Sequence, residues 1–209
     1  MHFADTTNLT AVATDGHRLA LSQMQSPAGA ENMPAVIVPR KAVSELRKLL
    51  DQESQEVDIQ LSDTRAEFSV GDIRLTTKLI DGSFPDYKRV IPVGNDKIIS
   101  VDVDLLSAAV DRVSTIASDK SRAIKLNISA GQLVLSATNP DASSATEMLE
   151  ITYAGEPIDI GFNARYLMDI LSQVQGEMIA IELADSGSPS LLRDPEDDTS
   201  IFVLMPMRV

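Results

Sequence analysis

The stretch Thr14-Asp15-Gly16-His17-Arg18-Leu19-Ala20-Leu21 contains the turn from which our prediction of the fold starts. Asp-Gly between residues of alternating polarity predicts a β-hairpin, because glycine accepts the positive φ that a two-residue turn demands. Asp15 could orient the imidazole of His17 for acid–base chemistry. A polar residue just after a hairpin turn is more often structural or a surface contact, however, and the other histidine is His2. The stretch by itself therefore defines no function.

The composition predicts a globular protein. With 209 residues and 44% apolar side chains, the chain can form one large domain or two of about 100 residues. The sequence has no apolar run of about 18 residues and no signal-peptide pattern, so we expect a cytoplasmic protein. Cysteine is absent, which excludes disulfides, thiol catalysis and zinc sites built on sulfur. Because nucleophile-elbow, calcium-loop and phosphate-loop motifs are also absent, we expect no catalytic residue, metal or cofactor.

Charge is distributed unevenly along the chain, whose formal net charge is -13. Residues 1–95 carry 10 Lys+Arg against 13 Asp+Glu, and residues 96–209 carry 8 against 18. A net acidic protein can still be basic along one face, so the total charge does not exclude nucleic acid as a partner.

An internal repeat with an offset of 124 residues relates the two parts of the chain. A period this long indicates repeated domains rather than a solenoid of short units. We expect one domain at 1–95 and another at 96–209, because glycines and prolines cluster at 81–96. The matched positions are Leu9 with Leu133, Ala13 with Ala137, Thr14 with Thr138, Val38 with Phe162, Val43 with Leu167 and Leu46 with Ile170.

Hydrophobic periodicity predicts an α+β fold of repeated β-α-β-β-β units. In the second unit we expect helices at 102–118 and 163–174, and strands at 125–129, 132–137, 147–153, 178–183, 190–192 and 201–205. In the first unit we expect a helix at 39–50, with Pro39 in its first turn, and strands at 57–61, 67–70 and 73–79. The loops at 25–34 and 194–200 are expected to be solvated. Nothing in the first unit matches helix 102–118, so we expect the chain to begin part-way through a domain.

Three further stretches could form binding surfaces. Four cations give one helix a positive charge, which fits either a solvated helix face or a nucleic-acid contact. The stretch from Phe84 to Val90 is either a rigid linker or one wall of a site. The stretch from Met205 to Val209 places two methionines beside a proline, and methionine either fills a core or lines a surface that accepts several partners. The four cations are Arg40, Lys41, Arg47 and Lys48.

Five motifs taken together resemble the bacterial sliding clamp, the beta subunit of DNA polymerase III. They are TDGHRL at 14–19, VIVPRK at 36–41, DGSFPDYKRV at 81–90, GFN at 161–163 and MPMR at 205–208. The resemblance implies three similar domains per complete chain, each with two helices packed on antiparallel sheets, and a head-to-tail homodimer that encircles duplex DNA. It also implies that this chain corresponds to the later part of the middle domain and the whole third domain. Such a fragment would keep the peptide pocket of the clamp but could not form the normal ring.

The resemblance also implies a pocket that docks linear peptides of the DNA polymerase III alpha subunit, the clamp loader, translesion polymerases and mismatch repair proteins. Its lining would be Thr14, Gly16, His17, Arg18 and Leu19 from the hairpin, Pro85, Arg89 and Val90 from the linker, and Val203, Met205, Pro206, Met207 and Arg208 from the C-terminal segment. The apolar members can accept leucine and phenylalanine anchors, and the polar ones can hold peptide carbonyls or carboxylates. The candidate DNA contacts are Arg40, Lys41, Arg47, Lys48 and Arg165, and Thr115 and Ile116 are candidates for the subunit interface.

Two other functions remain open from the residues alone. One is a hydrolase that uses Asp15 and His17, and the other is a structural β-rich oligomer without a peptide site.

Overall fold

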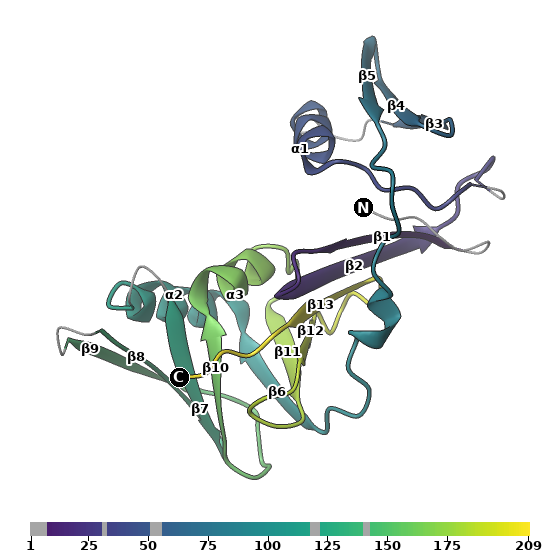
Figure 1. The fold of residues 1–209 in the computed structure, drawn as a ribbon. Coiled ribbons are helices and arrows are strands. Elements are labelled where there is room, and N and C mark those ends of the chain that lie inside the picture. Colours follow the sequence, from purple (N-terminus) through teal and green to yellow (C-terminus); the bar gives the residue numbers. More distant parts are fainter. Residues whose placement is uncertain (1–7, 31–32, 51–55, 118–121, 140–142) are drawn as a thin grey trace. The chain divides into compact units, whose positions relative to one another are not determined.

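The computed structural model describes residues 8–30, 33–50, 56–117, 122–139 and 143–209 (Figure 1). They form two compact units. Within the described residues, the first unit comprises 8–13 and Leu21–Tyr87, and the second comprises Thr14–Ala20 and Lys88–Val209. His2 lies outside the described residues, as do parts of the predicted loop 25–34 and the end of the predicted helix 102–118. The domain division at residue 95 stays a prediction.

The described residues of the first unit form a small antiparallel sheet and one helix. The sheet has the order β3-β4-β5, formed by Asp58–Leu61, Arg65–Val70 and Ile73–Lys78, and the helix is α1 (Arg40–Leu49). Alternate residues of β4 are buried, as expected of a strand with one face on a core. Phe68 stands opposite Ile59 and Leu75 in this sheet, and it joins Val36 and Ala42 in the core of the unit.

The hairpin strands β1 (Asn8–Thr14) and β2 (Arg18–Gln25) are neighbours in a sheet. The turn end of the hairpin, Thr14–Ala20, belongs to the second unit. In a short 3-10 helix, η1 (Tyr87–Arg89), Tyr87 is the last residue of the first unit, and Lys88 and Arg89 belong to the second.

In the part of the second unit that the structure describes, there are two antiparallel sheets and two helices (Figure 1). One sheet has the order β10-β7-β8-β9, and in the other the start of β2 is followed by β13-β12-β11-β6. Helices α2 (Val103–Ser114) and α3 (Ala164–Leu171) pack against each other. The strands are β6 (Lys97–Asp102), β7 (Ala123–Ser129), β8 (Gln132–Thr138), β9 (Ser144–Glu150), β10 (Ile158–Asn163), β11 (Met178–Leu183), β12 (Ser190–Arg193) and β13 (Ser200–Leu204).

Local sequence accounts for where both helices of the second unit begin. The carboxylate of Asp102 accepts the backbone N–H of Leu105 at 2.8 Å, and the amide oxygen of Asn163 accepts those of Arg165 and Tyr166 at 3.0 and 3.2 Å. Both residues therefore satisfy backbone donors that the first helical turn leaves unpaired. Because Asn163 is the last residue of β10, strand and helix α3 form one continuous segment.

Several predicted boundaries were wrong. Helix 102–118 ends at Ser114 and helix 163–174 at Leu171, because the chain continues from each in tighter turns with i to i+3 hydrogen bonds, such as Ala117 to Ser114 and Val174 to Leu171. The strand expected at 147–153 is 144–150, since the small residues from Ser144 onward pair with β8.

Three predictions of residue environment were also wrong. The apolar spacing of helix 102–118 predicts Leu105 on its buried face, but Leu105 is 56% exposed. Pro39 is the N-cap of α1 rather than part of its first turn. Asp194, expected in a solvated turn, is only 6% exposed, because its carboxylate accepts hydrogen bonds from the backbone N–H groups of Gln175, Gly176 and Glu196.

The internal repeat is present in the structure. An offset of 124 residues carries the first residue of β1 onto the first residue of β8, and the first residue of α1 onto that of α3. The same offset carries Lys41 onto Arg165, so both cations lie in the first turn of equivalent helices.

Candidate peptide-docking site

The hairpin turn is held by hydrogen bonds from its own polar side chains. Three residues, Asp15 to His17, connect β1 to β2, so the connection is one residue longer than the predicted two-residue turn. The Asp15 carboxylate accepts the backbone N–H groups of His17 and Arg18 at 3.0 and 3.1 Å, and the Thr14 hydroxyl donates to the Arg18 carbonyl at 2.8 Å. Gly16 adopts a φ of 86°, which a side chain would strain.

These contacts give Asp15 a structural role. Burial disfavours its charged form, but the hydrogen bonds from the backbone of His17 and from Arg18 outweigh burial and hold the pKa of the Asp15 carboxyl below its usual value. The carboxylate thus binds the backbone N–H of His17 and the Arg18 side chain. This arrangement builds the turn and gives no support to an acid–base pair.

Arg18 connects the hairpin to helix α3. Its guanidinium group pairs with Asp169 at 2.6 Å and with Asp15 at 3.1 Å, and its central carbon lies 4.3 Å from the ring centroid of Tyr166. Burial of the guanidinium opposes its charge, but the hydrogen bonds to Asp169 and Asp15 raise the pKa of Arg18 further above its usual value. The His17 ring stacks on the same Tyr166 ring, with centroids 6.1 Å apart.

Two backbone hydrogen bonds hold the C-terminal segment Met205–Val209. The N–H of Met205 donates to the carbonyl of His17 at 2.9 Å, and the N–H of Met207 donates to the carbonyl of Gly161 at 2.8 Å. A methyl group on Gly161 would stand 2.5 Å from the carbonyl oxygen of Met207. Glycine at 161 therefore allows the segment to lie directly on β10.

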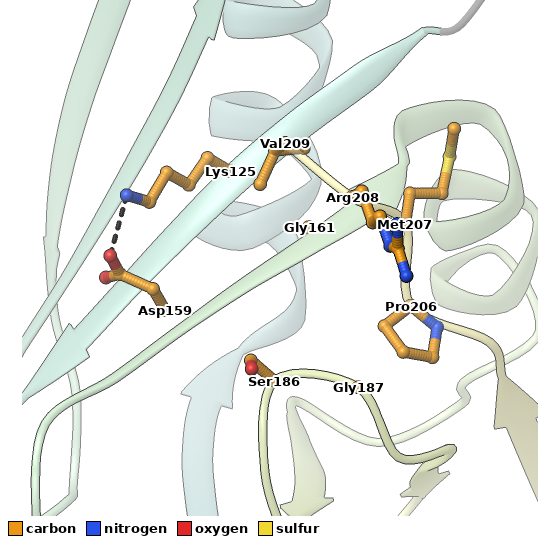
Figure 2. Close-up of a pocket in the computed structure, with 9 residues that line it drawn as sticks. All are labelled: Lys125, Asp159, Gly161, Ser186, Gly187, Pro206, Met207, Arg208 and Val209. Atoms are coloured by element: carbon orange, nitrogen blue, oxygen red, sulfur yellow. Dashed lines mark ion pairs between the residues drawn. The ribbon is translucent and has the colours of Figure 1, made fainter.

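An open cleft of about 600 Å³ lies beside this segment (Figure 2). The ion pair between Lys125 and Asp159, 2.6 Å apart, stands at one end of it. Hydrogen bonds from Lys125 and then Asn127 hold the pKa of the Asp159 carboxyl below its usual value. The lining consists of Lys125, Asp159, Gly161, Ser186, Gly187, Pro206, Met207, Arg208 and Val209.

The second unit brings together most of the predicted peptide-binding residues. Met205, Pro206 and Met207 are half-buried, whereas His17 and Arg208 are exposed. The turn residues Thr14 and Gly16 are exposed as well. Arg89 and Val90, near the start of the segment Lys88–Val209 of the unit, are also exposed. These residues offer surface to a ligand. Pro85 belongs to the first unit.

Two of the predicted apolar residues are not open to a ligand in this conformation. Leu19 is 3% exposed and Val203 is 0% exposed, so both side chains lie in the core beneath the surface. Their predicted role in accepting peptide anchors is untested, but in this structure they support the surface from below.

The sequence prediction did not include Tyr166 and Asp169. The only local signal is their spacing of three residues on a helix that follows an N-cap, which places them on one helical face. Their partners in the hairpin are far away in the sequence, so no periodicity could have identified the contact.

The predicted DNA contacts are all exposed cations on helices. Arg40 and Lys41 open α1, Arg47 and Lys48 lie in its last turn, and Arg165 lies in the first turn of α3. Lys48 pairs with Glu45 at 3.0 Å. Cations in a first helical turn oppose the helix dipole, so helix stability does not explain Arg40, Lys41 and Arg165.

The predicted interface residues lie at the end of α2. Thr115 is its C-cap and is exposed, and its hydroxyl donates to the carbonyl of Asp111. Ile116 is half-buried. A contact with another subunit at these residues stays a prediction.

The described residues lack two kinds of feature. No group of three or more His, Cys, Asp or Glu side chains there could hold a metal ion. In the same part of the chain, no helix is long and apolar enough to cross a membrane.

The two units have the α+β fold of sliding clamps, as the likeness to solved structures shows. Family models of the DNA polymerase III beta subunit match this chain, with the central domain at residues 2–86 and the C-terminal domain at residues 88–208. The chain belongs to the DNA polymerase III beta subunit family.

Individual relatives agree with this assignment. The chain is 50% identical over 203 residues to the beta sliding clamp of Caulobacter vibrioides and 40% identical over 203 residues to that of Escherichia coli K12. These matches cover 97% and 96% of this chain and 55% of each relative, so the chain spans about half the length of the curated relatives it matches.

Solved structures give the same result. A Bartonella birtlesii sliding clamp bound to griselimycin is 50% identical and superposes with a TM-score of 0.95 over 100% of this chain and 57% of its own. A Pseudomonas aeruginosa clamp, also bound to griselimycin, is 38% identical with a TM-score of 0.94 over 100% of this chain and 56% of its own.

Proposed function

We propose that the complete protein is a non-enzymatic processivity factor of DNA replication in the cytoplasm. It would encircle duplex DNA as a homodimer and tether the DNA polymerase III alpha subunit. The clamp loader, translesion polymerases and mismatch repair proteins would dock on the same surface. Membership of the DNA polymerase III beta subunit family supports this proposal.

The docking surface would consist of the hairpin turn Thr14–Ala20 and the C-terminal segment Met205–Val209. The observation that carries this assignment is the hydrogen bond from Met205 to His17, because it joins two of the three predicted parts of the site, the hairpin and the C-terminal segment. Half-buried methionines beside an exposed histidine suit a peptide with leucine and phenylalanine anchors, since methionine repacks easily around different side chains. The cleft beside Pro206 and Met207 would extend this surface.

Griselimycin, which is bound in solved structures of two relatives, can serve as a probe of the docking site. It is bound by the Bartonella birtlesii clamp, which shares half of its residues with this chain over the matched region. We therefore propose that this chain also binds griselimycin, in competition with linear peptides.

DNA would contact the exposed cations of α1 and α3. Contacts from lysine and arginine to phosphates carry no sequence information, which suits a protein that slides. The candidates are Arg40, Lys41, Arg47, Lys48 and Arg165.

Fluorescence anisotropy with a labelled clamp-binding pentapeptide tests the docking site. We expect wild type to bind the peptide and griselimycin to displace it. Met205→Ala should weaken binding about tenfold, as expected when a central anchor contact is lost. Met148→Ala is the matched control, because Met148 is an exposed methionine on β9. Failure of wild type to bind either ligand would overturn the site assignment.

A further inference from the structure

We propose that Asp169 on helix α3 is a positioning residue for the docking site, which it serves by fixing the hairpin turn through Arg18. The inference rests on the proposed docking function. Asp169 itself need not touch a bound peptide, because its effect reaches the ligand through the hairpin and the C-terminal segment.

The two carboxylates that pair with Arg18 have different structural roles. Asp15 lies in the same turn as Arg18, so their contact shapes the hairpin but cannot locate it relative to the rest of the unit. Asp169 lies 151 residues away in the sequence, on a helix of the unit, and its oxygen is 2.6 Å from the guanidinium group. The pair with Asp169 therefore ties the turn to α3.

Tyr166 gives this tie a defined orientation. It precedes Asp169 by three residues on the same helix, so both side chains lie on one face. The Arg18 guanidinium lies over the Tyr166 ring at 4.3 Å while Asp169 holds one of its nitrogens. A guanidinium fixed at its face and at its edge has little freedom to turn. His17, which precedes Arg18 in the hairpin, packs against the same ring, so Tyr166 also fixes the position of His17.

The position of the hairpin in turn determines that of the C-terminal segment. The carbonyl of His17 accepts the N–H of Met205, so a shift of the turn moves or breaks this bond. A continuous series of contacts thus leads from Asp169 through Arg18 and His17 to Met205, the proposed anchor contact.

This geometry also limits what Arg18 can offer a peptide. Two of its nitrogens already pair with the carboxylates of Asp15 and Asp169. Arg18 therefore acts as a structural connection. The exposed Arg208 can hold polar groups of a bound peptide.

Three variants test the inference in the 209-residue chain. Asp169→Asn keeps the shape and removes the charge, and Asp169→Glu restores the charge. Asp111→Asn makes the same change at an exposed position on α2 and is the matched control. Two quantities are measured, namely affinity for the labelled pentapeptide and hydrogen exchange at the Met205 amide, with the Ile179 and Ile181 amides of β11 as internal references.

We expect Asp169→Asn to weaken peptide binding about three- to fivefold, the size of effect given by a partly exposed ion pair. Exchange at the Met205 amide should accelerate by a similar factor, while the β11 amides and the thermal midpoint stay unchanged. Asp169→Glu should recover most of the affinity, and Asp111→Asn should match wild type.

Unchanged affinity and unchanged Met205 exchange in Asp169→Asn would overturn the inference. So would a loss of affinity accompanied by faster exchange at β11, since this marks general destabilisation. If wild type does not bind the peptide, the proposed function fails, and the exchange at Met205 alone then decides whether Asp169 positions the segment.

Discussion

The backbone N–H of Met205 donates to the carbonyl oxygen of His17 at 2.9 Å, and this bond connects the C-terminal segment to the hairpin turn. A second bond, from Met207 to Gly161, fastens the same segment to β10. Because β10 continues directly into α3, a single strand-and-helix segment supports both parts of the proposed docking surface. Changes within this segment should therefore affect ligand binding more than equivalent changes elsewhere.

Gly161→Ala should displace the C-terminal segment. The added methyl would meet the Met207 carbonyl at 2.5 Å, which is closer than side-chain carbons approach backbone atoms. We expect a loss of about 1–3 kcal/mol in the free energy of unfolding, as for other overpacked sites, together with weaker peptide binding. Urea denaturation and anisotropy measure the two effects.

Gly187→Ala is the control for this substitution. Gly187 also lines the cleft, but a methyl there would have its nearest contact with Asp185 at 3.7 Å, an ordinary packing distance. Its stability should stay within about 0.5 kcal/mol of wild type. Equal stability of the two variants would contradict a tight contact at residue 161.

Comparison of two variants, each lacking one helix N-cap, should separate effects on protein stability from effects on peptide binding. Asn163→Ala and Asp102→Ala each remove the acceptor for N–H groups in a first helical turn, and each should cost about 1 kcal/mol of stability. Only α3 carries Tyr166 and Asp169, so Asn163→Ala should also weaken peptide binding, while Asp102→Ala should leave it unchanged. Equal effects on binding would argue against α3 as the support of the site.

Local signals in the sequence predicted most elements of the second unit. Strand 178–183 was predicted to the residue, because its alternating apolar side chains face a core. The helix expected from residue 163 begins there, with Asn163 as its N-cap. Helix ends were missed because the apolar pattern continues into the tighter turns that follow Ser114 and Leu171. Periodicity alone cannot distinguish the two kinds of turn.

Less of the candidate site than of the fold could be predicted from the sequence. Turn chemistry predicted the hairpin, but the proximity of Met205 to His17 followed only from the family resemblance. The contact of Arg18 with Asp169 escaped both approaches, because the acidic side chain reads as an ordinary solvated residue on a helix. Asp194 was misread for the same reason, since its backbone partners at 175 and 176 lie in a different loop.

Asp194→Ala should be strongly destabilising. The substitution leaves the backbone N–H groups of Gln175, Gly176 and Glu196 without their acceptor, which should cost about 2–4 kcal/mol. Asp198→Ala, at an exposed position in the same turn, is the control and should change stability by less than about 0.5 kcal/mol. A small effect of Asp194→Ala would mean that water replaces the carboxylate.

The contribution of Asp194 should also depend on pH. Hydrogen bonds from Glu196 and Gly176 hold the pKa of the Asp194 carboxyl below its usual value, so folding favours its charged form. The resulting stability is complete above the unfolded pKa of about 4 and is lost as pH falls through the lower folded pKa. The difference in stability between wild type and Asp194→Ala should therefore be constant from about pH 5 to 7 and narrow below about pH 4. A difference that widens in acid would contradict this assignment.

Lys41→Gln and Arg165→Gln should weaken DNA binding while leaving folding intact or improved. Both cations are exposed at equivalent positions of the repeat, and both oppose the dipole of their helix. Removing either cation should stabilise the folded protein by about 0.3–1 kcal/mol, because its unfavourable interaction with the helix dipole is lost. If each cation also contacts a phosphate, the affinity for duplex DNA should fall, and the slope of the logarithm of the binding constant against the logarithm of the salt concentration should decrease in magnitude by about 1.

Titration of labelled duplex DNA over a range of low salt concentrations measures the affinity and the slope. Lys125→Gln is the control, because Lys125 pairs with Asp159. An unchanged salt slope in both variants would exclude Lys41 and Arg165 as phosphate contacts.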